Sequence, residues 1–288
     1  MFYEKFWNND YYMSEKFPTG QERRKVLEEN ARSIDNFKND GKDLINKSRH
    51  YTWLDSHLDN STLGKSFLES FYPLLEGKFE YSLRRYIENS LSKSKGEAIG
   101  VEFGGVGVQL FSDFRSGFFK KSFGVTLVDH RKNDTKLKDE KKLPSHTIVK
   151  GNIFSSKPYE KLKKLGVDKV DFIIERMGRG LEFVPTEPYK MSEVLNVWYK
   201  MLKEDGLMIV QTPPVFNNIL KEWGEKIEKD YKDQLIFKYN LGYGIASHVE
   251  HSSFRLQKLK GSPEELPLLS PRTLSKLEPY NLGSDNVS

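Results

Sequence analysis

Cysteine is absent from all 288 residues of the chain. A chain without cysteine cannot form a disulfide, a thiolate metal site, an iron–sulfur cluster or a cysteine nucleophile. Long apolar runs are absent too, since no stretch approaches the roughly 18 consecutive apolar residues of a membrane-spanning helix. The chain begins MFYEKFWNNDYYM, without the basic segment and apolar run of an export signal. We therefore expect a cytoplasmic globular protein with no membrane partner.

Charge of one sign is also not concentrated in any large block. The chain has 46 Lys and Arg against 41 Asp and Glu, which gives a net charge of +5, and the two signs are mixed along the sequence. This pattern is typical of a solvated surface and supports nucleic-acid contact only weakly. The hydrophobic content of 37% is enough for a well-packed core.

Residues 1–95 have the pattern of amphipathic helices. Apolar residues recur at helical spacing from Leu27 to Phe37, from Leu63 to Leu74 and from Leu83 to Leu91. We expect this region to be a helical cap or lid over a second domain.

From residue 97 the pattern changes to short apolar runs separated by helix-length segments. This alternation predicts an α/β fold with a doubly wound, mostly parallel sheet. The last two runs have no helical pattern between them, so we expect an antiparallel hairpin and seven strands with the last reversed. The domain would span residues 96–260, and residues 261–288 would be a mobile tail. The runs are Ala98–Phe103, Phe123–Val128, His146–Val149, Val170–Ile174, Leu207–Val210, Leu235–Leu241 and Phe254–Leu259.

A glycine-rich turn follows the first of these runs. Gly104, Gly105 and Gly107 lead into a predicted helix from Val108 to Phe119. Glycine allows a tight turn and close approach of a ligand, and a helix N-terminus attracts an anionic group. Asp129 ends the next strand, 22 residues after Gly107, where an acid can accept hydrogen bonds from ribose hydroxyls. The two features together predict a ligand that carries adenosine.

A nicotinamide dinucleotide fits this turn poorly. Its G-x-G-x-x-G pattern, begun at Gly104, needs glycine at 106 and glycine or alanine at 109. The chain has Val106 and Gln109 at those positions. The pattern therefore disfavours a dehydrogenase.

The stretch V-E-F-G-G-V-G, in which a strand ends in an acid before a glycine-rich turn, resembles motif I of class I S-adenosylmethionine-dependent methyltransferases. The resemblance extends over roughly residues 97–260 by strand count and motif order, including the final antiparallel hairpin. It implies S-adenosylmethionine as cofactor. Around the methionine part of the cofactor it places Glu102, Gly104, Gly105 and Gly107. At the ribose it places Asp129.

The same resemblance assigns residues after the third and fourth strands. In the segment G-N-I-F, it places Asn152 near the adenine amine and Ile153 against the ring. Glu175 and Arg176 follow the fourth strand, where the family lines the methyl-transfer site. Glu175 would contact the cofactor, and Arg176 the substrate.

The loop before the last strand offers further candidates. Tyr243 is expected to contact substrate, and either His248 or Glu175 is a candidate base for an acceptor that carries a proton. His248 and His251 lack a third ligand at matching spacing, so no metal site is expected. Methyl transfer would be an in-line displacement that needs mainly orientation and a desolvated pocket.

Several functions remain open. A small organic acceptor is the main hypothesis, and an RNA or protein substrate is the alternative within the same class. The family usually has glycine where this chain has Val106 and Val108. A binding or scaffold subunit without activity is therefore a further alternative.

Overall fold

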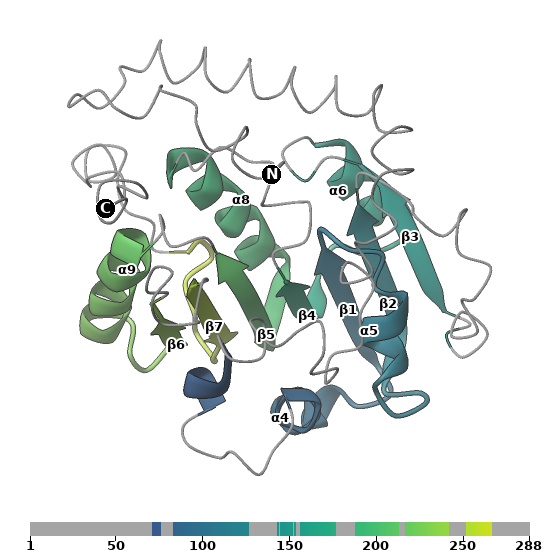
Figure 1. Cartoon of the computed structure of the whole chain (residues 1–288), viewed down its shortest axis with the longest axis horizontal. Coiled ribbons are helices and arrows are strands. Elements are labelled where there is room, and N and C mark those ends of the chain that lie inside the picture. The colour runs from purple at the N-terminus through teal and green to yellow at the C-terminus, as the bar shows by residue number, and fades with distance from the viewer. Residues whose placement is uncertain are drawn as a thin grey trace, which may run out of the picture.

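The computed structural model describes residues 71–75, 83–126, 143, 145–151, 153, 156–176, 188–212, 217–241 and 252–266. A seven-stranded sheet forms their centre (Figure 1), in the order β3-β2-β1-β4-β5-β7-β6. The strands are β1 Ala98–Phe103, β2 Phe119–Thr126, β3 His146–Lys150, β4 Val170–Glu175, β5 Leu202–Thr212, β6 Leu235–Asn240 and β7 Ser252–Lys258.

Strand direction confirms the predicted fold class. β1 is parallel to both of its neighbours, β2 and β4, and β5 continues the parallel series. β7 lies antiparallel between β5 and β6, so it is the one reversed strand of this sheet. Each predicted apolar run overlaps a strand, and β1 has the predicted bounds.

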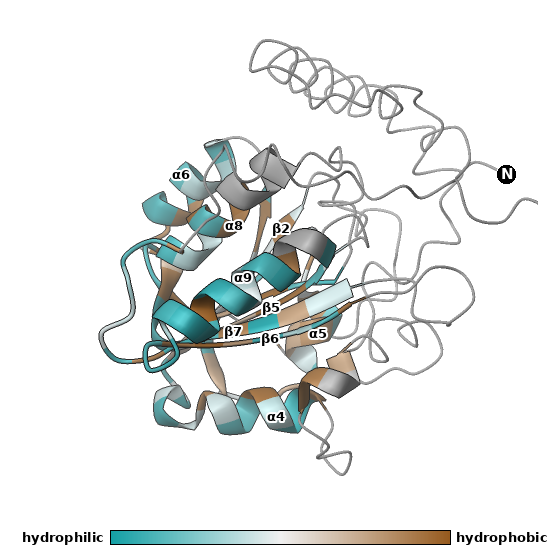
Figure 2. Ribbon diagram, turned by 90° about the vertical axis from the view of Figure 1, so that its left-hand side faces the viewer, coloured by the Kyte–Doolittle hydropathy of each residue, from teal (hydrophilic) through white to brown (hydrophobic). Residues whose placement is uncertain are grey.

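Helices cover both faces of the sheet, as Figure 2 shows with α4 on one side and α6 and α8 on the other. One face carries α6 Lys157–Lys164, α8 Pro188–Met201 and α9 Asn217–Asp230, whose apolar residues share a cluster with the strands. The other carries η3 Tyr72–Leu75, α4 Leu83–Ser90 and α5 Val108–Ser112. A short turn of 3-10 helix, η4 Ser92–Ser94, leads from α4 to β1.

Successive side chains of a strand point to opposite faces of the sheet, so each strand contributes residues to both apolar clusters. In β4, Phe172 and Ile174 pack toward α4 and α5, while Ile173 packs toward α8. On the α8 face, the Phe103 and Trp198 rings stack with centroids 4.5 Å apart. A strand buried on both faces is apolar at nearly every position, which is why β4 is a continuous apolar run in the sequence.

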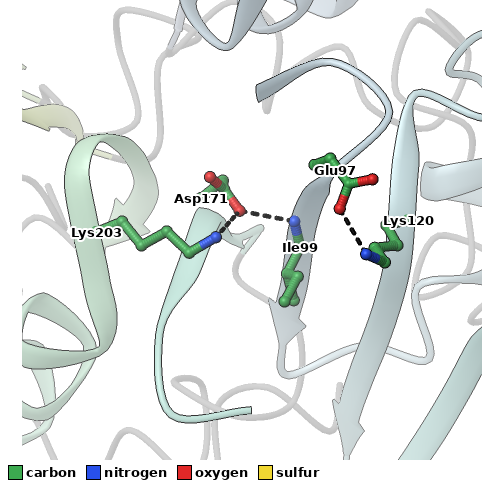
Figure 3. Close-up of polar contacts among 5 residues, drawn as sticks. All are labelled: Glu97, Ile99, Lys120, Asp171 and Lys203. Atoms are coloured by element: carbon green, nitrogen blue, oxygen red, sulfur yellow. Dashed lines mark hydrogen bonds and ion pairs between the residues drawn. The ribbon is translucent and has the colours of Figure 1, made fainter. Parts of the chain in front are cut away.

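Polar contacts fix the amino edge of the sheet (Figure 3). The Asp171 carboxylate accepts hydrogen bonds from the Ile99 amide and from Lys203 Nζ, both at 2.8 Å. It thereby links β1, β4 and β5. Lys120 Nζ lies 2.5 Å from Glu97 Oε2 beside them.

The described part of the N-terminal region is fastened to the sheet by Arg255 of β7. Arg255 Nε donates to the Leu74 carbonyl at 2.8 Å, and Nη1 donates to the Tyr86 hydroxyl at 2.6 Å. The guanidinium carbon also lies 5.3 Å from the centre of the Tyr86 ring. Residues 71–75 and α4 therefore pack on the sheet itself. The proposed domain boundary after residue 95 stays a prediction, and residues 1–70 and 267–288 lie outside the described part.

The predicted helix from Val108 to Phe119 is wrong in its length. α5 ends at Ser112, and β2 begins at Phe119. Gly117 has φ of 75°, which breaks a right-handed helix. The rings of Phe114, Phe118 and Phe119 then pack on one another, so tertiary contacts override the helical pattern.

The other helical predictions have mixed outcomes. The helix predicted from Leu83 to Leu91 is α4. Of the helix predicted from Leu63 to Leu74, only its end is described, where Leu74 lies in the 3-10 turn η3. The one predicted from Leu27 to Phe37 lies outside the described residues. Within the described ranges, every helix is too short or too polar to cross a membrane.

Candidate functional site

The glycine turn joins the end of β1 to the start of α5. Gly104 has φ of 86° and Gly107 has φ of 74°, a left-handed conformation that side-chain-bearing residues rarely adopt. The Gly104 amide donates to the Val125 carbonyl at 2.8 Å, which ties the turn to β2. Residues 104–108 are buried, so the turn is packed against the sheet.

The Glu102 carboxylate lies directly beneath this turn. A Cβ added to Gly105 would come within 2.6 Å of Glu102 Cδ, so only glycine fits above the acid. Arg176 holds the carboxylate from the other side, with Nη2 at 2.6 Å and Nε at 2.7 Å from Oε1. The two side chains are 3% and 8% exposed, which makes this a buried ion pair. Glu102 was predicted to contact the cofactor and Arg176 the substrate, and in the structure the two side chains contact each other.

Burial is the main influence on the pKa of Glu102. It raises the pKa of this carboxyl group, while the Arg176 charge, its hydrogen bond and the Gly107 backbone N–H act in the opposite direction. Oε2 of Glu102 is buried, and within the described part of the chain no donor meets it with hydrogen-bond geometry. A buried acceptor without a donor costs free energy, so this oxygen is suited to a ligand that brings a donor.

Glu175 ends β4 and is fully buried. It stands opposite Phe103 of β1 and Val210 of β5 in the strand register. Alternation along β4 puts Glu175 on the face of α8, whereas Glu102 lies on the face of α5. The structure therefore brings both acids to the carboxyl edge, on opposite faces of the sheet.

Buried polar residues continue along this edge, and none of them is among the predicted site residues. Thr212 ends β5 opposite Ser252, the first residue of β7. Ser252 Oγ donates to Asn217 Oδ1 at the start of α9. Among the described residues, none forms a hydrogen bond with the buried Thr212 Oγ1. Many polar residues lie at strand ends, so this position alone does not mark a site in the sequence.

Ile153 is buried in the apolar cluster that also contains Val101 and Phe103 of β1. Its carbonyl accepts a hydrogen bond from the Tyr159 hydroxyl at 2.7 Å, and Trp198 Nε1 donates to the same hydroxyl at 3.0 Å. Burial raises the pKa of Tyr159, so it remains a neutral donor. Four other predicted site residues lie outside the described part: Asp129, Asn152, Tyr243 and His248.

The strand order 3-2-1-4-5-7-6 with β7 reversed is the Rossmann-like architecture of class I S-adenosylmethionine-dependent methyltransferases. The order changes direction between β1 and β4, and ligands of open α/β sheets bind at such a point, outside the carboxyl ends of the strands. Glu102, Glu175 and Arg176 all lie there.

Solved structures that this chain resembles include methyltransferases. An rRNA methylase from Streptococcus thermophilus is 11% identical, with 61% of this chain and 96% of that chain covered and a TM-score of 0.42. The N-methyltransferase NodS from Bradyrhizobium japonicum, in complex with S-adenosyl-L-homocysteine, is 14% identical, with coverage of 73% and 98% and a TM-score of 0.40. Similarity at this level does not carry the activity of either enzyme over to this chain.

No protein-family model matches the chain, and no curated protein matches it.

Proposed function

We propose that this chain is an S-adenosylmethionine-dependent methyltransferase. The observation that carries the proposal is the buried glycine turn above Glu102, at the carboxyl end of β1 and beside the point where the strand order reverses. Small ligands of this fold class lie at that point. A ligand that carries a zwitterionic amino-acid group would need an acidic residue and glycines in a left-handed conformation, and this turn has both.

The residues fit the cofactor at one buried atom. No donor among the described residues forms a hydrogen bond with Glu102 Oε2, and an ammonium group such as that of the methionine part would supply one. Asp129 and Asn152 remain proposed contacts to ribose and adenine, with Ile153 against the adenine ring.

The chain's own contribution to the reaction would be orientation and exclusion of water. When bound, the cofactor would supply a methyl group activated by a sulfonium centre. Glu175 is buried at the carboxyl edge beside Arg176, where it could accept a proton from an acceptor hydroxyl or amine. His248 is the second candidate base. Arg176 and Tyr243 are proposed to position the acceptor, although Arg176 is already bonded to Glu102.

For the acceptor, we favour a small organic molecule. RNA or protein is the alternative, and the net charge of +5 gives RNA only weak support. Affinity for RNA that falls steeply with added salt would favour that alternative, because phosphate contacts release counterions.

A cofactor-binding subunit without turnover is a separate candidate. Val106 and Val108, at positions where the family usually has glycine, are 3% and 1% exposed. A buried valine at these two positions leaves less bare backbone in the turn than glycine would.

Calorimetric titration tests the proposal. The full chain should bind S-adenosylhomocysteine at micromolar concentration and NADH at least about a hundredfold more weakly, a difference of roughly 2.7 kcal/mol. Gly107→Ala should weaken binding, because alanine is strained at φ of 74°. Gly166→Ala is the matched control, since Gly166 has φ of 76° and nothing within 4 Å of an added Cβ.

The outcomes separate the candidates. Binding together with methyl transfer to an acceptor supports the enzyme, and binding without transfer to any tested acceptor class supports the scaffold subunit. Absence of binding at millimolar S-adenosylhomocysteine and S-adenosylmethionine would rule out both.

A further inference from the structure

His146, the first residue of β3, reaches back to the glycine turn from a position 40 residues further along the chain. Its Nε2 lies 2.8 Å from the Val106 carbonyl oxygen, in the middle of the turn. Its Nδ1 lies 2.8 Å from Ser122 Oγ, on the neighbouring strand β2. The imidazole thus connects β2 and β3 to the backbone of the turn.

The partners fix the direction of both hydrogen bonds. A carbonyl oxygen can only accept, so Nε2 must carry a proton and donate it. In the neutral ring, Nδ1 is then the acceptor and Ser122 Oγ–H the donor. Ser122 is 4% exposed, so water does not readily replace this contact. The chain Ser122 to His146 to Val106 therefore selects one tautomer.

Close packing leaves the turn little freedom around this contact. A Cβ added to Gly107 would meet His146 Cε1 at 3.0 Å, so the ring also touches the second left-handed glycine. A Cβ added to Gly124 of β2 would come within 2.0 Å of the Val106 oxygen. The Phe111 ring of α5 lies 5.8 Å from the imidazole, between centroids. The Val106 carbonyl is thus confined between Gly124 and His146.

We propose that His146 is a positioning residue for the glycine turn, acting through its hydrogen bond to the Val106 carbonyl, with Ser122 holding its tautomer. His146 would not touch a ligand. It would fix the direction of the Val106 peptide, and with it the backbone that a bound ligand meets. The part of this proposal that concerns ligand affinity rests on the proposed function, but the part that concerns the turn does not.

The turn itself is tested on the full chain without ligand, by amide hydrogen exchange at residues 104–111. His146→Phe keeps an aromatic ring beside Phe111 and removes the Nε2 donor, and exchange should become about fivefold faster or more, as expected for one lost buried hydrogen bond. His146→Gln can place an amide N–H near the same carbonyl and should restore most of the protection. Ser122→Ala should give an intermediate effect, because the ring then loses its second partner.

Tyr199→Phe is the matched control. It also removes one bond from a side chain to a backbone carbonyl, the 2.7 Å contact to Pro263, but near the end of α8 rather than at the turn. The proposal is overturned when His146→Phe exchanges no faster than this control at residues 104–111. It is equally overturned when His146→Gln is as fast as His146→Phe, because the ring contact and not the hydrogen bond would then be responsible.

Calorimetry with S-adenosylhomocysteine adds the second measurement. His146→Phe should weaken binding about tenfold, His146→Gln should bind within about threefold of the unchanged chain, and Tyr199→Phe should bind as the unchanged chain does. Unchanged affinity in His146→Phe would contradict the role in binding. Failure of the unchanged chain to bind would count against the proposed function alone, since the exchange measurement still decides the role of His146 in the turn.

Discussion

Two nitrogens of the Arg176 guanidinium contact a single oxygen of Glu102, at 2.6 and 2.7 Å. The contact lies where β1 and β4 end. The ion pair joins the two strands between which the strand order reverses. It also supports the glycine turn, because Gly105 rests on the same carboxylate. The acid of the turn therefore has a structural role before any ligand binds.

Neutralising Glu102 should destabilise the fold. Glu102→Gln keeps the shape of the side chain but leaves Arg176 buried without its counter-charge, which should cost about 3 kcal/mol of unfolding free energy. Urea unfolding measures this loss. The double variant Glu102→Gln with Arg176→Met should recover part of it, since no unpaired charge remains.

An exposed ion pair provides the control for that prediction. Lys93 Nζ lies 2.7 Å from Asp205 Oδ2, with side chains 80% and 41% exposed. Lys93→Met should leave the unfolding free energy nearly unchanged, because water screens this pair. A loss in Glu102→Gln no larger than this would contradict a buried pair that holds the turn.

Arg255 should determine whether the N-terminal region stays on the sheet. Arg255→Met removes the bonds to the Leu74 carbonyl and the Tyr86 hydroxyl, and we expect a loss of about 2 kcal/mol with faster amide exchange in residues 71–75 and α4. Lys238→Met is the control, because exposed Lys238 faces Arg255 in the register of β6 and β7. Equal exchange in the two variants would show that other contacts hold this region.

The sheet could be predicted from the sequence because its strands are apolar on both faces. Ala98–Phe103 is apolar apart from Glu102, and Val170–Glu175 is apolar apart from Asp171 and Glu175. Both runs could be recognised without knowledge of the neighbouring strands. The ends of other strands could not be predicted. β5 begins at Leu202, five residues before the predicted start, with Asp205 at φ of 61°.

Only part of the candidate site could be predicted from the sequence, because only some of its residues are neighbours along the chain. The glycines and Glu102 are adjacent in the sequence, and their pattern marks a turn. The contacts that hold the turn come from Arg176, Gly124 and His146, which lie 18 to 74 residues away from their partners. Contacts of this kind leave no local spacing in the sequence, so only the structure could reveal them.

Lys258 of β7 should make stability depend on pH in the alkaline range. Its Nζ lies 3.1 Å from the Leu202 carbonyl and 3.9 Å from the centre of the Tyr199 ring. Burial and the nearby Lys169 charge lower the pKa of Lys258 from 10.5 to about 8. Between these two values the unfolded chain binds more protons than the folded chain, so the unfolding free energy should rise with pH.

The slope should reach at most about 1.4 kcal/mol per pH unit. Urea unfolding between pH 8 and 9.5 measures it below the range in which Tyr199 titrates, since burial raises the pKa of Tyr199 to about 12. Lys258→Met should flatten this rise relative to the unchanged chain. Identical pH profiles for the two proteins would show that Lys258 titrates normally.

Gly124 should be required for the position of the turn. Gly124→Ala places a methyl group where the Val106 carbonyl now lies, so the turn must move away from β2. We expect affinity for S-adenosylhomocysteine to fall about tenfold or more, as measured by calorimetry. Gly117→Ala, in which the added Cβ meets nothing within 4 Å, should lose stability because of its φ of 75° but keep its affinity. Equal affinities in the two variants would contradict the confinement of the turn.

The most direct test of the account is a nuclear magnetic resonance titration of the nitrogen-15-labelled chain with S-adenosylhomocysteine. We expect saturable shifts of the Gly104, Gly105 and Gly107 amide signals, with the same apparent dissociation constant as calorimetry gives. Binding that leaves these three signals unchanged, or no binding at millimolar ligand, would contradict it.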